Sequence, residues 1–485
     1  MYSFLGLHFC FIVNNANLMY NNYIIGVCMN KEELQYKKMV NTPVKKLILN
    51  LAIPTTISML ITAIYNIADT YFVAKLGASA SGAVGVVFSF MAIVQAIGFT
   101  LGMGGGSYIS ALLGARKEKE AQEVGSSAFY GAIFLGFLLL LFGILFLRPM
   151  LSLLGATPTV LPYATDYAKY IVIGAPIMTS SFVLNNLLRA EGKAKLAMIG
   201  LTTGGILNMG LDPLFINVFD LGISGAAIAT LVSQGVSFLI LLSMFVLKKS
   251  IIKLSIFNLS KRAYVYLEIF RIGFPSLCRQ GFASLASILL NNQAGKYGGD
   301  PCLSALTIIS KIVMIIFSVC LGIGQGYQPV SGYNYFSKNY KRCKEAMFFT
   351  FIVSTILMSL SSIIFFIFSK EVMAFFIDDS EVIEIGKVAL RYQCIALPLL
   401  SLNTICNMTF QSTRKKFRAA LLSCCRQGIF FIPVIIILPL FTGLTGVLIS
   451  QALADVLTFI FSMFFFVAYC IEINKKIKEE EAIEE

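Results

Sequence analysis

Histidine is nearly absent from this sequence, since His8 is the only one in 485 residues. Imidazole proton relays, histidine-bound metals and the Ser-His or Cys-His pairs of nucleophilic enzymes are therefore excluded. The eleven cysteines show no CxxC spacing, and most fall in apolar segments, so neither a disulfide framework nor a zinc site is expected. We predict that the protein is not an enzyme and that it holds no cofactor and no resident metal.

Charge is also scarce. Charged residues make up 13% of the chain, hydrophobic residues 57%, and the mean hydropathy is +0.80. A water-soluble globule is excluded by this balance, and the lipid bilayer is the expected surrounding. The net charge of +13 does not indicate nucleic-acid binding, because Lys and Arg lie in short clusters between long apolar runs rather than on one basic face.

Twelve mostly apolar runs divide the chain, and a membrane helix needs about 20 such residues. The second and eighth runs are rich in glycine, so we expect them to tilt or kink. The sequence predicts an all-α membrane protein with twelve transmembrane helices. The runs lie at about residues 47–74, 83–113, 124–147, 164–188, 196–219, 225–247, 272–294, 302–335, 346–369, 388–410, 419–440 and 446–471.

The segment at residues 1–28 lacks a basic region and a small-residue cleavage site, and asparagines interrupt its apolar stretch. It fits neither a signal peptide nor a spanning helix. Met29 then opens a normal polar lead into the first apolar run. We predict that translation starts at Met29 and that residues 1–28 are a gene-model extension, within an N-terminal tail of residues 1–40.

Basic residues mark the orientation, because Lys and Arg are retained on the cytoplasmic side of a membrane. On one side of the predicted helices, the loops and tails carry 28 of them, in clusters such as Arg116/Lys117/Lys119 and Lys338/Lys341/Arg342/Lys344. The sequence therefore predicts that both termini are cytoplasmic. The other side carries six, which are Lys75, Arg148, Lys296, Lys370, Lys387 and Arg391.

The two halves of the chain repeat each other. Each half holds six predicted helices, so both halves have the same orientation, and a pseudo-two-fold axis along the membrane normal relates the two bundles. The matching features are Pro54 with Pro275, Gly77 with Gly298, LGMGGG at 101–106 with LGIGQG at 321–326, Pro176 with Pro398, and Gly222-Ile-Ser-Gly225 with Gly443-Leu-Thr-Gly446. The predicted units are the N-lobe at 41–247, a linker at 248–271, the C-lobe at 272–471 and a charged cytoplasmic tail at 472–485.

Two acids of the first half lie inside predicted membrane helices, where an ionisable group costs about 2.5–3.5 kcal/mol on insertion scales. Asp69 and Asp212 should lie at similar depth, with Asn66 and Asn208 on the same helical faces as their respective acids. Thr230 reaches the same level from the sixth helix. We predict that these five residues form one polar cluster that binds a coupling proton or sodium ion. The plainer alternative is that the two acids only bond to helix ends.

The second half does not copy these acids, since Asp69 aligns with Leu290 and Asp212 aligns near Pro433. Ion coupling should then belong to the first half alone. The buried-looking charges of the second half could pair as structural bridges or act directly in transport. They are Arg279, Lys311, Arg426 and Asp455.

Prolines occupy equivalent places in the first and seventh helices, at Pro54 and Pro275. Because proline removes a backbone donor, Pro54 could let its helix bend when Asp69 is protonated. The alternative is a proline in the first turns of the helix, where it has no such role. Spacing alone does not separate the two.

At this point the sequence resembles the multidrug and toxic compound extrusion (MATE) family, of the prokaryotic DinF-like type, over about residues 40–470. Taken together, the features that carry the resemblance are specific to the family. They are AIPTTISMLITAIYNIADTYFVAKLG (52–77), ALLGARKEKEA (111–121), LRAEGKAK (188–195), LNMGLDPLFI (207–216) and GISGAAIAT (222–230).

The resemblance implies a multi-pass protein of the prokaryotic plasma membrane that exports drugs or other organic cations in exchange for H⁺ or Na⁺. It places the coupling-ion pattern on Asp69, Asn208, Asp212 and Thr230, with the bending proline at Pro54. We expect a monomer. The chain lacks the acids that another branch of the family carries in helices 7, 8 and 10, so a second-lobe sodium site is not implied.

Three other kinds of membrane protein are alternatives to this interpretation. A lipid or lipid-linked oligosaccharide flippase of the same superfamily is the main alternative, but such proteins more often have fourteen spans and a basic cavity. A major-facilitator carrier would carry a GxxxDRxGRR-type loop after helix 2, where this chain reads GARKEKEA. A membrane enzyme would need a catalytic constellation, and none is found.

Overall fold

Helices make up nearly all of the computed structural model, which describes residues 31–484. Short π-helical or 3-10 turns at Leu214–Val218, Ile256–Asn258, Leu397–Leu399 and Cys425–Phe430 interrupt or link them. The helices are α2 (Lys31–Asn41), α3 (Val44–Ala74), α4 (Ala78–Gly114), α5 (Glu118–Leu145), α6 (Leu147–Leu153), α7 (Leu161–Ala190), α8 (Ala194–Pro213), α9 (Gly222–Val246), α10 (Ala263–Phe336), α11 (Tyr340–Ile367), α12 (Ser369–Phe376), α13 (Ser380–Ala396), α14 (Leu400–Ser412), α15 (Lys416–Cys424), α16 (Phe431–Thr442) and α17 (Leu444–Glu484).

Within the described residues, eleven apolar helical segments are long enough to cross a membrane. One of them, α10, has 74 residues and contains a non-helical residue, Gly299, with φ 61° and ψ −160°. A positive φ is readily adopted by glycine because it has no Cβ. The chain turns back at Gly299, so α10 supplies two crossings. The predicted all-α membrane fold with twelve spans is confirmed.

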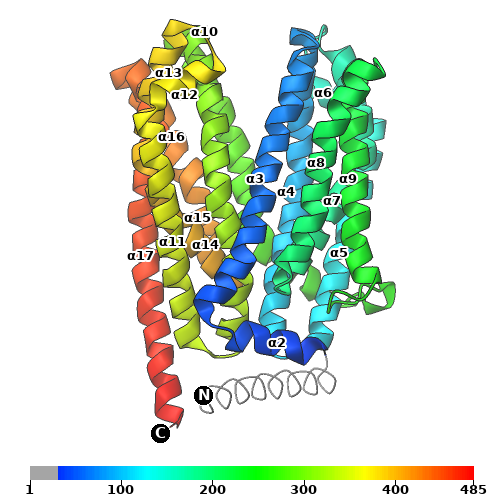
Figure 1. The fold of residues 1–485 in the computed structure, drawn as a ribbon, viewed down its shortest axis with the longest axis vertical. Helices are drawn as coiled ribbons and strands as arrows, with labels where there is room; N and C mark the ends of the chain where they lie inside the picture. Colours follow the sequence, from blue (N-terminus) through cyan, green and yellow to red (C-terminus); the bar gives the residue numbers. More distant parts are fainter. Residues whose placement is uncertain (1–30, 485) are drawn as a thin grey trace, which may run out of the picture.

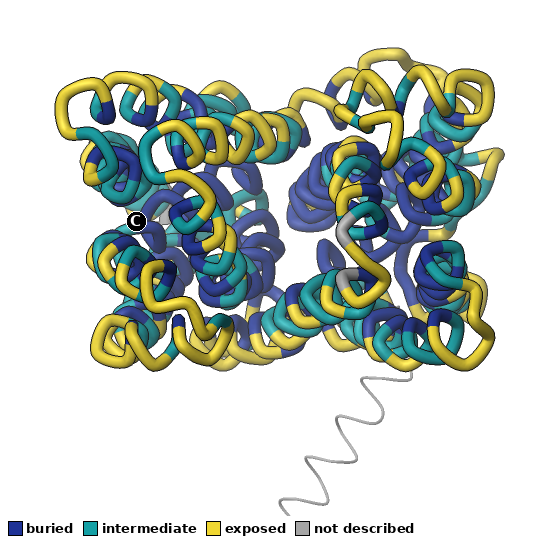
Figure 2. Tube along the Cα trace, turned by 90° about the horizontal axis from the view of Figure 1, so that it is seen from above, coloured by how far each residue is buried: buried dark blue, intermediate teal, exposed yellow. Residues whose placement is uncertain are grey.

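Two bundles of helices stand side by side, α3–α9 in one and α10–α17 in the other (Figures 1 and 2). We call them the N-lobe and the C-lobe. They meet at the end of the molecule that carries α2, the 247–262 segment and the C-terminal end of α17, and their ribbons diverge toward the opposite end. We call the end where they meet the basic end, because the predicted basic loops lie there.

The buried apolar side chains follow the same division. One cluster joins residues of both lobes, such as Leu47, Ile109 and Leu187 with Tyr327 and Leu402. The other two clusters each belong to a single lobe. Apolar burial therefore holds the lobes together near the basic end, while each lobe has a core of its own toward the opposite end.

Glycines allow the closest approach between the lobes. A Cβ on Gly273 of α10 would collide with the carbonyl oxygen of Thr100 in α4, and one on Gly326 would lie 2.5 Å from Cα of Ala52 in α3. Small residues at helix interfaces let the backbones come together. The close packing of the two Gly-rich segments is thus located at the junction of the lobes.

The internal repeat extends to single backbone turns. Residues at equivalent positions share a positive φ, and non-glycine residues rarely adopt such a conformation. The pairs are Arg116 with Lys338, Gly192 with Arg414, and Gly222 with Gly443. The two lobes therefore repeat their helix ends as well as their helices.

Three helices cross the predicted boundaries between units. α10 begins at Ala263, inside the range assigned to the linker, and α17 continues to Glu484, through the range assigned to a tail. α2 begins within the tail assigned to residues 1–40 and ends at Asn41. The prediction about residues 1–28 falls outside the described residues.

Candidate functional site

Three of the predicted cluster residues lie together inside the N-lobe. Asp212 of α8 has an exposure of 0%, and Asn208, one turn earlier on the same helix, is 3% exposed. The Asn208 amide Nδ2 donates to Oδ1 of Asp212 at 3.2 Å and to Oγ1 of Thr230 in α9 at 3.4 Å. A buried carboxylate is thus held by an amide that also reaches the neighbouring helix.

Several oxygens of this cluster have no hydrogen-bond partner within residues 31–484. They include Oδ2 of Asp212 and Oδ1 of Asn208, and both are buried. Tyr167 of α7 adds a buried hydroxyl that lies close to Thr230 without forming a hydrogen bond of normal geometry. A buried polar atom without a partner is costly. The cluster therefore contains buried oxygen atoms that accept no hydrogen bond from the described residues.

Tyr167 was not among the predicted residues, and the sequence gives little signal for it, because it is one of 20 tyrosines. Its position in the structure depends on the packing of α7 against α9. A tyrosine near the start of a membrane helix is common at a membrane interface. Only the fold separates this tyrosine from the others.

Asp69 reaches the same region from α3. Gly205 of α8 packs against Ile61 and Tyr65, so that a Cβ there would lie 2.9 Å from Ile61. Asp69 is one turn beyond Tyr65, and its charge interacts with that of Asp212. Its Oδ1 atom is buried and has no hydrogen-bond partner in the described part of the chain. The electrostatic influence of Asp69 therefore reaches Asp212, and a shared ion site of the two acids stays a prediction.

Asn66 behaves differently from the other four predicted residues. Its amide Nδ2 donates to the carbonyl oxygen of Thr62 at 2.8 Å, within α3. Thr70 in turn donates to the carbonyl oxygen of Asn66 at 2.8 Å. In this conformation Asn66 is bonded to its own helix rather than to Asp69 or Asn208.

Pro54 is an interior residue of α3, well past the first turn of the helix, which begins at Val44. Proline cannot donate the helical hydrogen bond of that turn, so the helix is weakened there. Its neighbours Ala52 and Thr56 are the residues of α3 that pack on Gly326 and Gly322 of α10. The weak turn of α3 therefore lies at the junction of the lobes, about four helical turns before Asp69.

The C-lobe also buries a carboxylate, at Asp455 of α17, with an exposure of 1%. Arg426 Nε donates to its Oδ1 at 2.8 Å, and Gln451 Nε2 donates to the same oxygen at 3.0 Å. Gln393 Nε2 donates to Oδ2 at 2.9 Å. The predicted structural bridge is thus formed between Asp455 and Arg426, whereas Arg279 and Lys311 do not join it.

Polar side chains also connect the two lobes near the basic end. Arg189 of α7 donates through Nη1 to Oε1 of Gln325 in α10 and through Nη2 to Oδ1 of Asn186 at 3.0 Å. Gln328 Nε2 donates to Oγ of Ser107 in α4 at 3.0 Å. A small pocket between the lobes is lined by these residues and by Met103. These bonds close the basic end.

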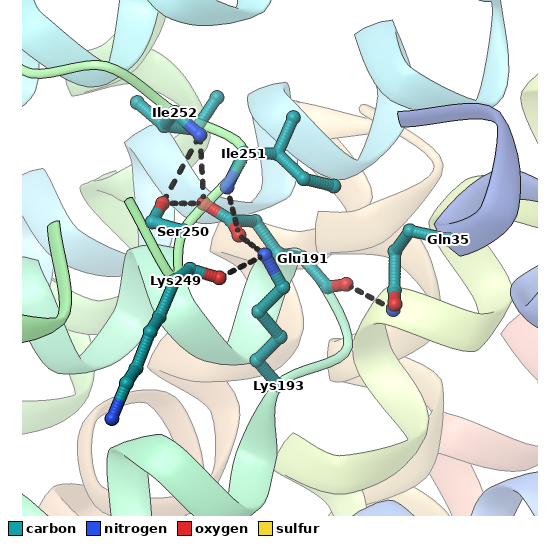
Figure 3. Close-up of polar contacts among 7 residues, drawn as sticks. All are labelled: Gln35, Glu191, Lys193, Lys249, Ser250, Ile251 and Ile252. Atoms are coloured by element: carbon teal, nitrogen blue, oxygen red, sulfur yellow. Dashed lines mark hydrogen bonds and ion pairs between the residues drawn. The ribbon is translucent and has the colours of Figure 1, made fainter. Parts of the chain in front are cut away.

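Glu191, which directly follows α7, binds the beginning of the segment that links α9 to α10 (Figure 3). Its carboxylate has an exposure of 0% and accepts bonds from Oγ of Ser250 and from the backbone N–H of Ile251 at 2.9 Å. Lys193 forms an ion pair with it at 2.8 Å. In the sequence, Glu191 is noted only as part of the LRAEGKAK motif (188–195). Its partners Ser250 and Ile251 come two helices later in the chain, so no local spacing relates them to Glu191.

Comparisons with known proteins agree with this architecture. The MatE family model matches residues 54–214 and 275–437. The multidrug export protein MepA of Staphylococcus saprophyticus is 26% identical over 457 residues, and that of Staphylococcus aureus is 27% identical over 457 residues. In both cases 94% of this chain and 100% of the relative are covered. A solved structure described as the outward-facing conformation of a multidrug resistance MATE family transporter has a TM-score of 0.86, 25% identity, and coverage of 93% of this chain and 99% of that one.

Proposed function

The chain belongs to the MatE family, and from this premise we propose that it is a multidrug efflux antiporter. It exports organic, often cationic, compounds in exchange for inward-moving H⁺ or Na⁺. Its relatives are transporters and two are multidrug exporters by name, which favours efflux over the flippase alternative. The single observation that carries the coupling mechanism is the buried acid pair of the N-lobe.

The coupling ion binds between Asp69 and Asp212. A proton on one carboxylate would relieve the repulsion between the acids, and so would a sodium ion among their oxygens. Oδ2 of Asp212 has no hydrogen-bond partner in the described residues and can take up the proton. Oδ1 of Asn208, also without a partner there, can accept a hydrogen bond from the protonated acid or coordinate sodium. In the described part of the chain no three His, Cys, Asp or Glu side chains gather as a metal site. Sodium would therefore need amide and hydroxyl oxygens as well as carboxylates, and oxygen ligands suit a hard cation.

Alternating access follows from the way the lobes meet. Shared buried side chains join the lobes at the basic end, and their ribbons diverge toward the other end (Figure 1). In the cycle that we propose, ions enter this conformation from the far side. Ion binding neutralises Asp69, and α3 then changes its bend near Pro54. Because Pro54 lies between Ala52 and Thr56, that change acts directly on the junction with α10. The lobes separate at the basic end and admit substrate.

The basic end faces the cytoplasm, with both termini on that side, in the plasma membrane of a prokaryotic cell. Two observations support this placement: the excess of Lys and Arg in the loops of that end, and the bacterial origin of the MepA relatives. The protein acts as a monomer. Fusion of a reporter active only in the cytoplasm to residue 485 should give signal, and signal from a periplasmic reporter would contradict the orientation.

The test is ethidium efflux from cells that express Asp69→Asn. Asparagine keeps the size of the side chain but cannot change its charge, so efflux should fall to the level of cells without the protein. Asp166→Asn is the matched control, because Asp166 is exposed and its ion pair is with its neighbour Lys169, at 2.9 Å. Efflux at the wild-type rate in Asp69→Asn, with equal protein in the membrane, would remove Asp69 from the mechanism. Proteoliposomes with separately imposed Na⁺ and pH gradients identify the ion.

A further inference from the structure

The interior between the lobes holds more positive than negative charge. Arg189 of α7 and Arg279 of α10 both lie beside Met103 of α4, and Lys311 lies further along α10. Within residues 31–484, neither arginine forms an ion pair with an acid. Cations at membrane depth are costly and mark functional places.

Arg279 is the clearest case. Its guanidinium contacts the thioether sulfur of Met103 at 3.8 Å, and Ser276, three residues earlier, reaches the same sulfur at 3.3 Å. A thioether is a weak acceptor and carries no charge. Arg279 lies six residues beyond Gly273, about 9 Å along the helix from the closest contact of the lobes. Its charge is therefore unbalanced just above the closed junction.

Arg189 borders the same place from the N-lobe and lines the pocket that contains Met103. It is 7% exposed, and its bonds go to the neutral amides of Gln325 and Asn186. Its Nε donor is buried and has no partner in the described residues. Arg189 thus lines this pocket with an unused Nε donor, and Arg279 contacts Met103, which is part of the pocket wall. No carboxylate is among the residues that line the pocket.

Lys311 extends the positive charge toward the open end. It lies eleven residues before Gly322, or three helical turns, so it shares the face of α10 that contacts α3. Gly322 of α10 contacts Thr56 of α3, and this contact is a common reference point for the two helices. Lys311 lies about 17 Å from it along α10, and Asp69 lies about 20 Å from it along α3, so the two residues are at similar height. The charges of the two residues interact. Lys311 thus lies within the electrostatic influence of Asp69 when that acid is ionised, whereas neither arginine forms an ion pair within residues 31–484.

The other buried acids are already occupied. Asp455 pairs with Arg426, Glu268 pairs with Arg414 and Lys416, and Glu191 pairs with Lys193. Asp212 is enclosed within the N-lobe. A purely cationic substrate would meet repulsion from Arg279 and Arg189 on its way between the lobes, whereas a group of negative charge would be attracted.

We propose that Arg279 and Arg189 bind an anionic group of the transported compound, so that zwitterionic drugs with a carboxylate are preferred substrates. The proposal rests on the efflux function above and specifies its substrate class. When the basic end is open, both guanidinium groups face the entering carboxylate. When it closes, Gln325 takes a bond of Arg189, which weakens the hold on the anion and favours release on the far side.

Norfloxacin and its ethyl ester form the matched pair of probes, since both carry the basic amine and only norfloxacin carries the carboxylate. Purified protein in phosphatidylcholine vesicles avoids competition from anionic lipid headgroups. We expect KM for norfloxacin to be about tenfold lower than for the ester, the contribution of one hydrogen bond between charged groups. Arg279→Gln should remove this difference, because KM for norfloxacin rises while KM for the cationic ester, which is no longer repelled by Arg279, falls. Arg279→Lys should retain part of the difference.

Arg271→Gln is the control, because Arg271 lies on the same helix but is exposed. It should leave both KM values unchanged. Equal KM values for the two probes in the wild type, or an equal change for both in Arg279→Gln, would overturn the proposal, as would transport of ethidium without norfloxacin. Failure of the wild type to move norfloxacin, its ester and ethidium would instead contradict the efflux function itself.

Discussion

In the N-lobe the buried carboxylate of Asp212 keeps one oxygen unpaired, whereas in the C-lobe both oxygens of Asp455 accept bonds from the chain. The two sites share one pair of equivalent residues in the repeat, although Asp212 and Asp455 are not equivalent to each other. Thr230 of the first cluster is equivalent in the repeat to Gln451 of the second, and the two lie on the equivalent helices α9 and α17. The lobes share a scaffold, but each satisfies its buried acid by a different kind of partner.

Arg426 explains the difference, because its guanidinium is a cation that cannot leave. It neutralises Asp455 permanently and also stacks over Phe317, 4.9 Å from the ring centroid. Asp212 has an amide and a hydroxyl nearby instead, and these can bond to a charged or a neutral carboxylate. A site that exchanges an ion needs an acid without a fixed counter-charge. The comparison supports our proposal that exchange takes place in the N-lobe and that the acid of the C-lobe has a structural role.

The largest expected effect comes from neutralising each buried acid in turn. Asp212→Asn should reduce ion-coupled transport at least about 100-fold, because the exchange site then loses one of the two carboxylates between which the ion binds. Asp455→Asn should retain measurable coupling in whatever protein remains folded. Dye uptake into proteoliposomes, normalised to folded protein, gives both values. Equal loss of coupling in the two variants would break the comparison.

The second effect concerns stability rather than transport. Asp455→Asn leaves Arg426 buried without a counter-charge, and breaking a buried pair in this way costs about 3–5 kcal/mol. Asp212→Asn should change stability much less, since Asp212 has no such partner. Thermal denaturation in detergent, followed by loss of the monodisperse peak, compares the two.

The double variant Asp455→Asn/Arg426→Gln is the control for this second effect. Removing both charges leaves neutral groups that can bond to one another, so it should recover most of the lost stability. A double variant as unstable as the sum of the two single variants would show that Arg426 and Asp455 do not act as a pair.

A third effect tests the scaffold that both lobes share. Gly273→Ala places a methyl group against the carbonyl oxygen of Thr100, so the lobes should no longer close fully at the basic end. Gly281→Ala, on the same helix with nothing within 4 Å of an added Cβ, is the matched control. Hydrogen–deuterium exchange of residues 104–114 should rise in the first variant and stay unchanged in the second. Unchanged exchange in both would place the close contact elsewhere.

Sequence patterns predicted the parts of this molecule that depend on local composition. Apolar runs located the spans, and the four-residue spacing of Asn208 and Asp212 placed both on one face of α8, where they are bonded. The Asp455, Arg426 and Gln393 network could not be derived in detail, because three separate helical segments contribute to it and no local spacing relates them. Asn66 shares a helical face with Asp69 as predicted, yet its amide bonds to Thr62 instead.

The smallest effect compares the equivalent prolines. Pro54→Ala restores a helical hydrogen bond in α3 and should slow transport by a few-fold, because a stiffer helix passes less of the change at Asp69 to the junction of the lobes. Pro275 is also inside a helix, but in the lobe for which we propose no ion exchange, so Pro275→Ala should leave the rate unchanged. Initial rates in vesicles under one fixed ion gradient measure both. A slower rate in Pro275→Ala alone would mean that the C-lobe, rather than the N-lobe, bends during transport.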